Sequence, residues 1–126
     1  MIKAYDGVRP VETITTSITL VPADSGKMFL IATDSLVITL PATVEGLDYL
    51  FVSTGADGNN IITISPNASD GIFGTITLAA SVVQKDDTAD VDVVLTKGSA
   101  LKGDSIHLMG DGVDGYAIVS STGIWA

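Results

Sequence analysis

Hydrophobic and polar residues alternate along several short stretches of this chain. One face of residues 12–20 is formed by Ile14, Thr16, Ile18 and Leu20. Threonine and serine fill the positions between them. A period of two places successive side chains on opposite sides of a strand, so this stretch predicts a half-buried β-strand.

The same alternation recurs through the rest of the chain. Residues 27–33 and 36–41 flank Asp34 and Ser35, which predicts a tight hairpin. In residues 47–54 the pattern places Leu47, Tyr49 and Phe51 on one face. Further strands are predicted over residues 61–66, 71–80, 80–85, 91–97, 104–110, 115–121 and 123–126.

No segment keeps the 3.6-residue period of an amphipathic helix, and β-branched residues dominate the apolar positions. The pattern therefore predicts an all-β protein. We expect an antiparallel β-sandwich or jelly-roll-like barrel of about 8–10 short strands. A sheet of this kind has edges to cover, and self-association is one way to cover them.

The first residues differ from the rest. Residues 1–11 hold two of the six basic residues, and the sequence Arg9-Pro10 disfavours a helix. We expect an extended N-terminal arm over residues 1–11 and a single β domain over residues 12–126. The arm is either a loose start or a segment that orders against a neighbouring subunit.

Charge and composition exclude several classes of partner. Fifteen acidic residues against six basic ones give a net charge of −9, and the basic residues form no cluster that could neutralise phosphates. The apolar runs are too short for a signal peptide or a membrane span. We therefore expect neither a nucleic acid nor a membrane as partner. An acidic surface suits a partner that presents basic residues.

The sequence contains no pattern that indicates catalysis. His107 is the only histidine, there is no cysteine, and no nucleophile elbow, phosphate loop or metalloprotease motif is present. His107 is expected on the face opposite Ile106 and Leu108. We predict no enzyme, no cofactor and no catalytic residue.

Two acidic loops leave a metal ion as an alternative to plain turns. Residues 110–117, GDGVDGYA, partly fit a calcium-binding nonapeptide, but the motif occurs once and Met109 replaces its leading glycine. Residues 86–92 offer Asp86, Asp87, Asp90 and Asp92 as oxygen ligands. Aspartates are also common in solvated turns, so the expectation is no metal, with a divalent cation as the minority alternative.

The chain ends with its only tryptophan, Trp125. A large apolar side chain at a terminus needs something to hold it. Residues 104–110 and 115–121 predict a hairpin around Gly110–Gly115, and residues 123–126 predict a last short strand. We expect Trp125 to pack into the body or into a seam between subunits.

The order of these segments resembles a family of phage structural proteins. The matching residues are Leu40-Pro41, the stretch Gly46 to Phe51, Gly103-Asp104, and Gly115 to Trp125. They are similar to head decoration (cement) proteins of tailed bacteriophages and to some tail-fibre-associated modules. The resemblance spans roughly residues 24–126 and leaves the arm uncovered. Tyr116 stands where the family often has tryptophan.

This resemblance implies a compact antiparallel β fold that forms a homotrimer. It implies binding to the major capsid protein on the outer capsid surface of a virion, where the trimer stabilises the shell. The expected capsid or subunit contacts are Lys3, Tyr5, Arg9 and Trp125. Two alternatives stay open: a phage tail-fibre or tail-associated trimeric β-module, and a carbohydrate-binding β-sandwich.

Overall fold

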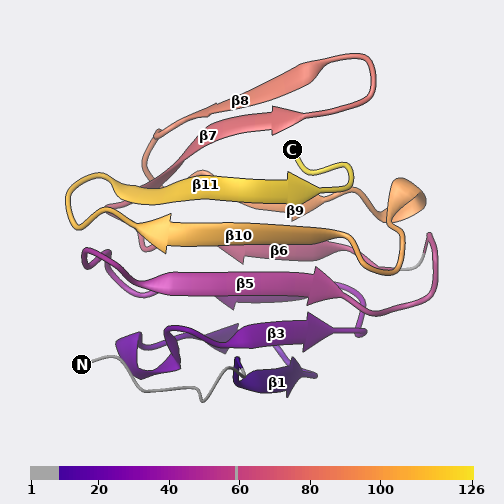
Figure 1. The fold of residues 1–126 in the computed structure, drawn as a ribbon, viewed down its shortest axis with the longest axis horizontal. Helices are drawn as coiled ribbons and strands as arrows, with labels where there is room; N and C mark the ends of the chain where they lie inside the picture. Colours follow the sequence, from indigo (N-terminus) through magenta and orange to yellow (C-terminus); the bar gives the residue numbers. More distant parts are fainter. Residues whose placement is uncertain (1–8, 59) are drawn as a thin grey trace.

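The computed structural model describes residues 9–58 and 60–126, and it shows an all-β protein built from two facing sheets (Figure 1). The larger sheet has seven strands in the order β1-β3-β5-β10-β11-β7-β8, and the smaller has four in the order β2-β4-β6-β9. The strands are β1 (Val11–Ile14), β2 (Ile18–Thr19), β3 (Met28–Ile31), β4 (Leu36–Thr39), β5 (Asp48–Ser53), β6 (Ile62–Ser65), β7 (Gly71–Thr77), β8 (Val82–Asp86), β9 (Val93–Leu95), β10 (Ser105–Gly110) and β11 (Gly115–Thr122).

Helical structure is limited to two short 3₁₀ segments within the described ranges. They are η1 (Pro22–Asp24) and η2 (Lys97–Ser99). Neither segment is long or apolar enough to cross a membrane, and the described residues form no other helix that could.

The first half of the chain winds back and forth between the two sheets. β1, β3 and β5 lie in the seven-stranded sheet and pair in parallel, and β2, β4 and β6 do the same in the four-stranded sheet. Each consecutive pair of strands is thus one turn of a coil. The pairing in this half is wholly parallel, so the expectation of an antiparallel fold is wrong there.

The predicted hairpin at Asp34 and Ser35 is also wrong, because this turn is a corner between layers. The side chain of Asp34 accepts a hydrogen bond from the Ile61 backbone N–H at 2.8 Å. Ser35 has a positive φ of 64° and donates its N–H to the Ile61 carbonyl at 3.0 Å. These bonds tie the corner to the next turn of the coil and direct β4 into the second sheet.

Residues 12–20 likewise form two strands in place of one. β1 ends at Ile14, which is buried, and β2 begins at Ile18, which is 37% exposed. The hydroxyl of Ser17 accepts a hydrogen bond from the Val37 N–H at 2.9 Å. Alternation continues through the crossing between sheets, so the pattern alone could not locate the break.

The second half of the chain contains the antiparallel pairs. β7 pairs with β8, and β10 pairs with β11, as the sequence predicted for residues 104–121. β10 also pairs antiparallel with β5, which joins the two halves within one sheet. β11 pairs in parallel with β7, so the larger sheet is mixed.

The core lies between the sheets and is formed by the alternate side chains of their strands. Leu47, Tyr49 and Phe51 are buried, which confirms the face predicted for residues 47–54. The ring of Phe29 stacks on Phe51 with centroids 5.5 Å apart, and Tyr49 lies 6.2 Å from Tyr116. Aromatic pairs of this kind add roughly 0.5–1.5 kcal/mol each beyond their buried area.

Trp125 is fully buried, with 0% of its surface exposed. The chain leaves β11, crosses to the other sheet and lies beside β9, where Ala126 and Val94 exchange backbone hydrogen bonds of 2.9 and 2.8 Å. The indole N–H donates to the Thr122 carbonyl at 3.0 Å. Packing into the body is therefore confirmed. The indole has no surface left for a capsid or subunit contact.

We expect Trp125→Ala to lower the free energy of unfolding by about 3–5 kcal/mol, since it empties a large buried site. Equilibrium urea denaturation measures this loss. Ile124→Ala is the matched control, because its neighbouring side chain is 41% exposed and should cost far less. Equal effects of the two variants would contradict the buried position of the indole.

Candidate functional site: the loop end

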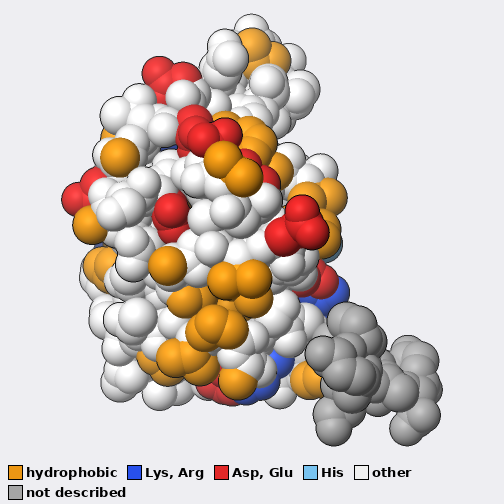
Figure 2. Space-filling model, turned by 90° about the vertical axis from the view of Figure 1, so that its left-hand side faces the viewer, with side chains coloured by type: hydrophobic (Ala, Val, Ile, Leu, Met, Phe, Trp, Pro, Cys, Tyr) orange, Lys and Arg blue, Asp and Glu red, His pale blue; other side chains and the backbone are white. Residues whose placement is uncertain are grey.

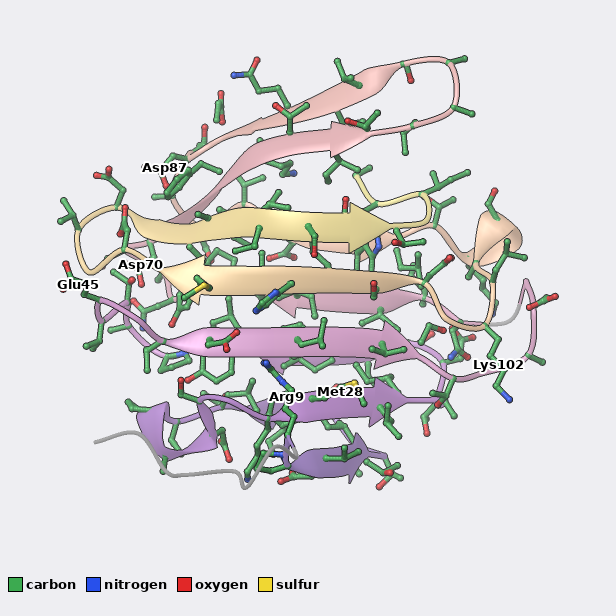
Figure 3. All side chains as sticks on the ribbon, in the orientation of Figure 1. Arg9, Met28, Glu45, Asp70, Asp87 and Lys102 are labelled. Atoms are coloured by element: carbon green, nitrogen blue, oxygen red, sulfur yellow. The ribbon has the colours of Figure 1, made fainter. Side chains whose placement is uncertain are left out.

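Five loops meet at one end of the two sheets, which we call the loop end. They are residues 20–27, 41–47, 66–70, 87–92 and 111–114. In Figure 3, Glu45, Asp70 and Asp87 are labelled at this end and Lys102 at the opposite one. The loop end carries exposed apolar side chains, acidic side chains and the start of the described chain, so it is the candidate interaction surface.

Two buried tyrosines fix the loop end to the core. The hydroxyl of Tyr49 donates to the Val21 carbonyl at 3.0 Å, and that of Tyr116 donates to the Pro41 carbonyl at 2.7 Å. Burial raises the pKa of Tyr49 to about 12, and it raises the pKa of Tyr116 further. Both hydroxyls therefore keep their protons and continue to donate at neutral pH.

Thr43 links three of the loops. Its N–H donates to the carboxylate of Asp70 at 2.8 Å, and its hydroxyl donates to the Gly115 carbonyl at 2.7 Å. The same hydroxyl oxygen accepts the Gly112 N–H at 3.0 Å. Asp70 is almost fully buried, so this bond satisfies a group that would otherwise be costly to bury.

The acidic glycine loop between β10 and β11 uses its first carboxylate internally. One oxygen of Asp111 accepts the backbone N–H groups of Val113, Asp114 and Gly115 at 2.8, 2.8 and 3.0 Å. These bonds lower the pKa of Asp111, with the Gly115 N–H as the largest cause. The carboxylate closes a turn, a role that aspartate commonly has in loops.

The glycines of this loop allow close packing. A Cβ at Gly110 would lie 2.6 Å from the Val44 carbonyl oxygen, and one at Gly115 would overlap the Gly71 backbone. From the sequence, these glycines were expected in a turn, with a cation site as the alternative. Across residues 9–58 and 60–126, no three His, Cys, Asp or Glu side chains are grouped closely enough to hold a metal ion.

Three valines at the loop end are strongly exposed. Val21, Val44 and Val113 are 51%, 52% and 81% exposed. Figure 2 faces this end and shows hydrophobic side chains gathered on it with acidic side chains around them. The hydrogen bonds of Tyr49 and Thr43 hold the loops that carry these valines, so the apolar surface is rigidly presented.

Carboxylates crowd the part of the loop end next to β7 and β8. The pKa of Asp87 is raised, first by burial and then by repulsion from Asp114, Asp111 and Asp70, with a smaller contribution from Asp86. One oxygen of Asp87 is buried without a hydrogen-bond partner. This part of the surface is thus strongly negative at neutral pH.

Arg9 lies against the outer face of the seven-stranded sheet (Figure 3). Its guanidinium pairs with Asp48 at 3.2 Å and reaches the Lys27 carbonyl at 3.4 Å. Asp48 also pairs with His107, which lies on the outer face as the alternation predicted. The Arg9–Asp48 pair could not be predicted from the sequence, because only the pairing of distant strands brings the two residues together.

Lys27 connects Arg9 to the loop of residues 20–27, which carries Val21. Its ammonium group lies 2.9 Å from both Glu12 and Asp24, and these hydrogen bonds raise its pKa, with Glu12 as the larger cause. Asp24 belongs to η1, which follows Val21 directly. The point where the predicted arm joins the body is therefore at the loop end. Lys3 and Tyr5 lie outside the described residues.

The aromatic residues bear on the carbohydrate-binding alternative. Tyr49, Tyr116 and Trp125 are fully buried and offer no ring for stacking on a sugar. Among the aromatic side chains of residues 9–58 and 60–126, Phe73 alone keeps some exposure. It lines an open cavity of about 410 Å³ together with Gln84, Lys85, Asp86, Asp87 and Asp114.

No protein-family model matches this chain, and no curated protein sequence matches it.

We expect Asp87→Asn to raise the free energy of unfolding at pH 7 by less than about 1 kcal/mol, because it removes a charge that is disfavoured first by burial and then by solvent-screened repulsion from the neighbouring carboxylates. Asparagine accepts the positive φ of 66° at this position. The raised pKa means that the folded state holds the proton more tightly than the unfolded state. The gain is therefore full above the raised pKa and disappears as the pH falls towards the ordinary aspartate value of about 3.9.

Thermal unfolding of both proteins between pH 3 and pH 8 measures this difference. Asp57→Asn is the control, since Asp57 lies at the opposite end. A gain that stays constant over the whole pH range would contradict the raised pKa of Asp87.

Proposed function

We propose that this protein is a non-enzymatic structural protein of a bacteriophage virion, which binds the outer capsid surface as a homotrimer and stabilises the shell. The sequence resemblance over residues 24–126 supports this class of protein. Within the proposal, the two facing sheets act as a sandwich-type scaffold and the loop end faces the major capsid protein.

The observation that carries the proposal is the rigid apolar surface at the loop end. Loops that carry exposed apolar side chains on a fixed scaffold are typical of binding surfaces. Val21, Val44 and Val113 are held outward by loops whose backbone is bonded to buried tyrosines and to Thr43. Little conformational entropy is lost when such a surface binds, because it is already ordered.

The charge around these valines indicates the kind of surface that they meet. Asp70, Asp111 and Asp114 lie close enough to Asp87 for their charges to raise its pKa. A capsid surface with apolar hollows and lysine or arginine around them would match this arrangement. A protein that binds the assembled shell and not its separate subunits stabilises the assembled state by mass action.

The double variant Val44→Ser/Val113→Ser should weaken binding to undecorated phage heads by more than tenfold. Burial of one valine contributes roughly 1.5–3 kcal/mol, and tenfold in affinity corresponds to about 1.4 kcal/mol. Co-sedimentation of the purified chain with heads gives the affinity, and the heat resistance of the heads reports stabilisation.

Leu101→Ser is the matched control, because Leu101 is 55% exposed and lies next to Lys102 at the opposite end. Retained affinity in the valine variant, or an equal loss in the Leu101 variant, would contradict binding through the loop end. A wild-type chain that ignores heads would contradict the proposed function as a whole.

Deletion of residues 1–8 tests the arm. This deletion keeps Arg9 with its bond to Asp48, and it keeps Pro10, whose carbonyl accepts the Met28 N–H at 2.8 Å. We expect the melting temperature to change by no more than about 2–4 °C, because these bonds of Arg9 and Pro10 are kept and a loss of about 0.5 kcal/mol gives a shift of this size. Capsid affinity should fall at least tenfold, which is about 1.4 kcal/mol. Unchanged affinity would show that the arm makes no contact with the shell.

A further inference from the structure

The seven-stranded sheet ends in two edge strands, β1 and β8 (Figure 1). Within residues 9–58 and 60–126, no strand pairs with the outer side of either one. An unpaired edge offers a row of backbone donors and acceptors to another strand. Both edges are short, at four and five residues.

The free backbone groups of the two edges can be assigned from the bonds they already make. In β1, the Pro10 carbonyl accepts the Met28 N–H, so the groups of Val11 and Thr13 point away from β3. Next to the two ends of β8, the Ser81 carbonyl accepts the Leu78 N–H and the Asp87 N–H donates to the Ile72 carbonyl, so the groups of Val82, Gln84 and Asp86 point away from β7.

On both edge strands, the same relation holds between the direction of the backbone groups and the direction of the side chains. On both strands the residues with free backbone groups carry outward side chains, as shown by Val11 at 54% and Val82 at 62% exposure. The intervening residues face inward: Ile14 is buried and Val83 packs against the core. When β1 of one copy pairs antiparallel with β8 of another, the sheet therefore continues across the join, and its core-facing side stays on the same side in both copies.

The side chains favour one register of this join. When Val11 lies opposite Asp86, Thr13 lies opposite Gln84, and the inner pairs are Glu12 with Lys85 and Ile14 with Val83. One pair is opposite in charge and the other is apolar, and such cross-strand pairs contribute roughly 0.2–1 kcal/mol each. Glu12 and Lys85 can both form a further ion pair. The Glu12 side chain is 40% exposed although it already pairs with Lys27, and the Lys85 ammonium group donates one hydrogen bond, to the Asp92 carbonyl at 2.9 Å.

Joins between identical edges lack this match. In a join of two copies of β1, the charged side chain on the inner face would be Glu12 on both strands, and in a join of two copies of β8 it would be Lys85 on both strands. Charge complementarity thus selects β8 of a second copy as the partner of β1.

We propose that copies of this chain assemble by antiparallel pairing of β1 of one copy with β8 of the next. This inference rests on the self-association in the proposed function and names the surfaces that form it. The join uses two different surfaces, so repeated joins form a ring where the rotation between copies closes, and the trimer of the proposed function is such a ring. β1 runs away from the loop end and β8 runs towards it, so an axis along the strands points every loop end in the same direction.

Thr13→Pro tests the join, because it removes an N–H that points away from β3 and leaves the bonds within the chain intact. We expect native mass spectrometry and sedimentation to show trimers for the wild type and monomers for this variant, with an unchanged far-ultraviolet circular dichroism spectrum. Thr13→Val keeps the N–H and should stay trimeric. A trimeric Thr13→Pro variant or a monomeric wild type would overturn the proposal.

Charge exchange provides a second test that does not depend on proline. Glu12→Lys and Lys85→Glu should each reduce the trimer fraction, and the combined variant should restore it. Failure of the combined variant to restore trimers while it remains folded would overturn the register. Binding to heads is scored separately: trimers that dissociate as expected but ignore heads contradict the proposed function alone, whereas decoration by trimers that survive Thr13→Pro contradicts the edge pairing alone.

Discussion

The two buried tyrosines, Tyr49 and Tyr116, connect the core of this protein to its candidate binding surface. Their rings pack between the sheets, and their hydroxyls hold the carbonyls of Val21 and Pro41 in the loops. Because the rings are fully buried in a close-packed core, the hydrogen bonds from their hydroxyls restrain the two loops. The exposed valines are therefore presented by the same packing that stabilises the fold.

The proposed binding surface and the proposed subunit contacts lie on different parts of the molecule. The valines occupy the loop end, whereas β1 and β8 are the two lateral edges of the larger sheet. Copies joined along these edges leave the loop end open and repeat it several times on one side. Weak contacts by each copy then combine, since linked binding sites gain avidity without any new contact.

Sequence alternation predicted which side chains of a strand face the core, as it did for Leu47, Tyr49 and Phe51, and it predicted the last hairpin and the buried Trp125. It could not predict strand partners, because a period of two is the same in parallel and antiparallel pairs. The corner at Asp34 and Ser35 thus resembled a hairpin, although a hydrogen bond to Ile61 makes it a passage between sheets. The Arg9–Asp48 pair and the loop end could not be predicted for the same reason, since both depend on which strands are neighbours.

Electron cryomicroscopy of phage heads incubated with the purified chain shows directly which end of the protein meets the shell. We expect density for trimers on the outer capsid surface, with the loops around Val44 and Val113 against the major capsid protein. Trimers seated through the opposite end, around Leu101 and Lys102, or heads without added density would contradict it.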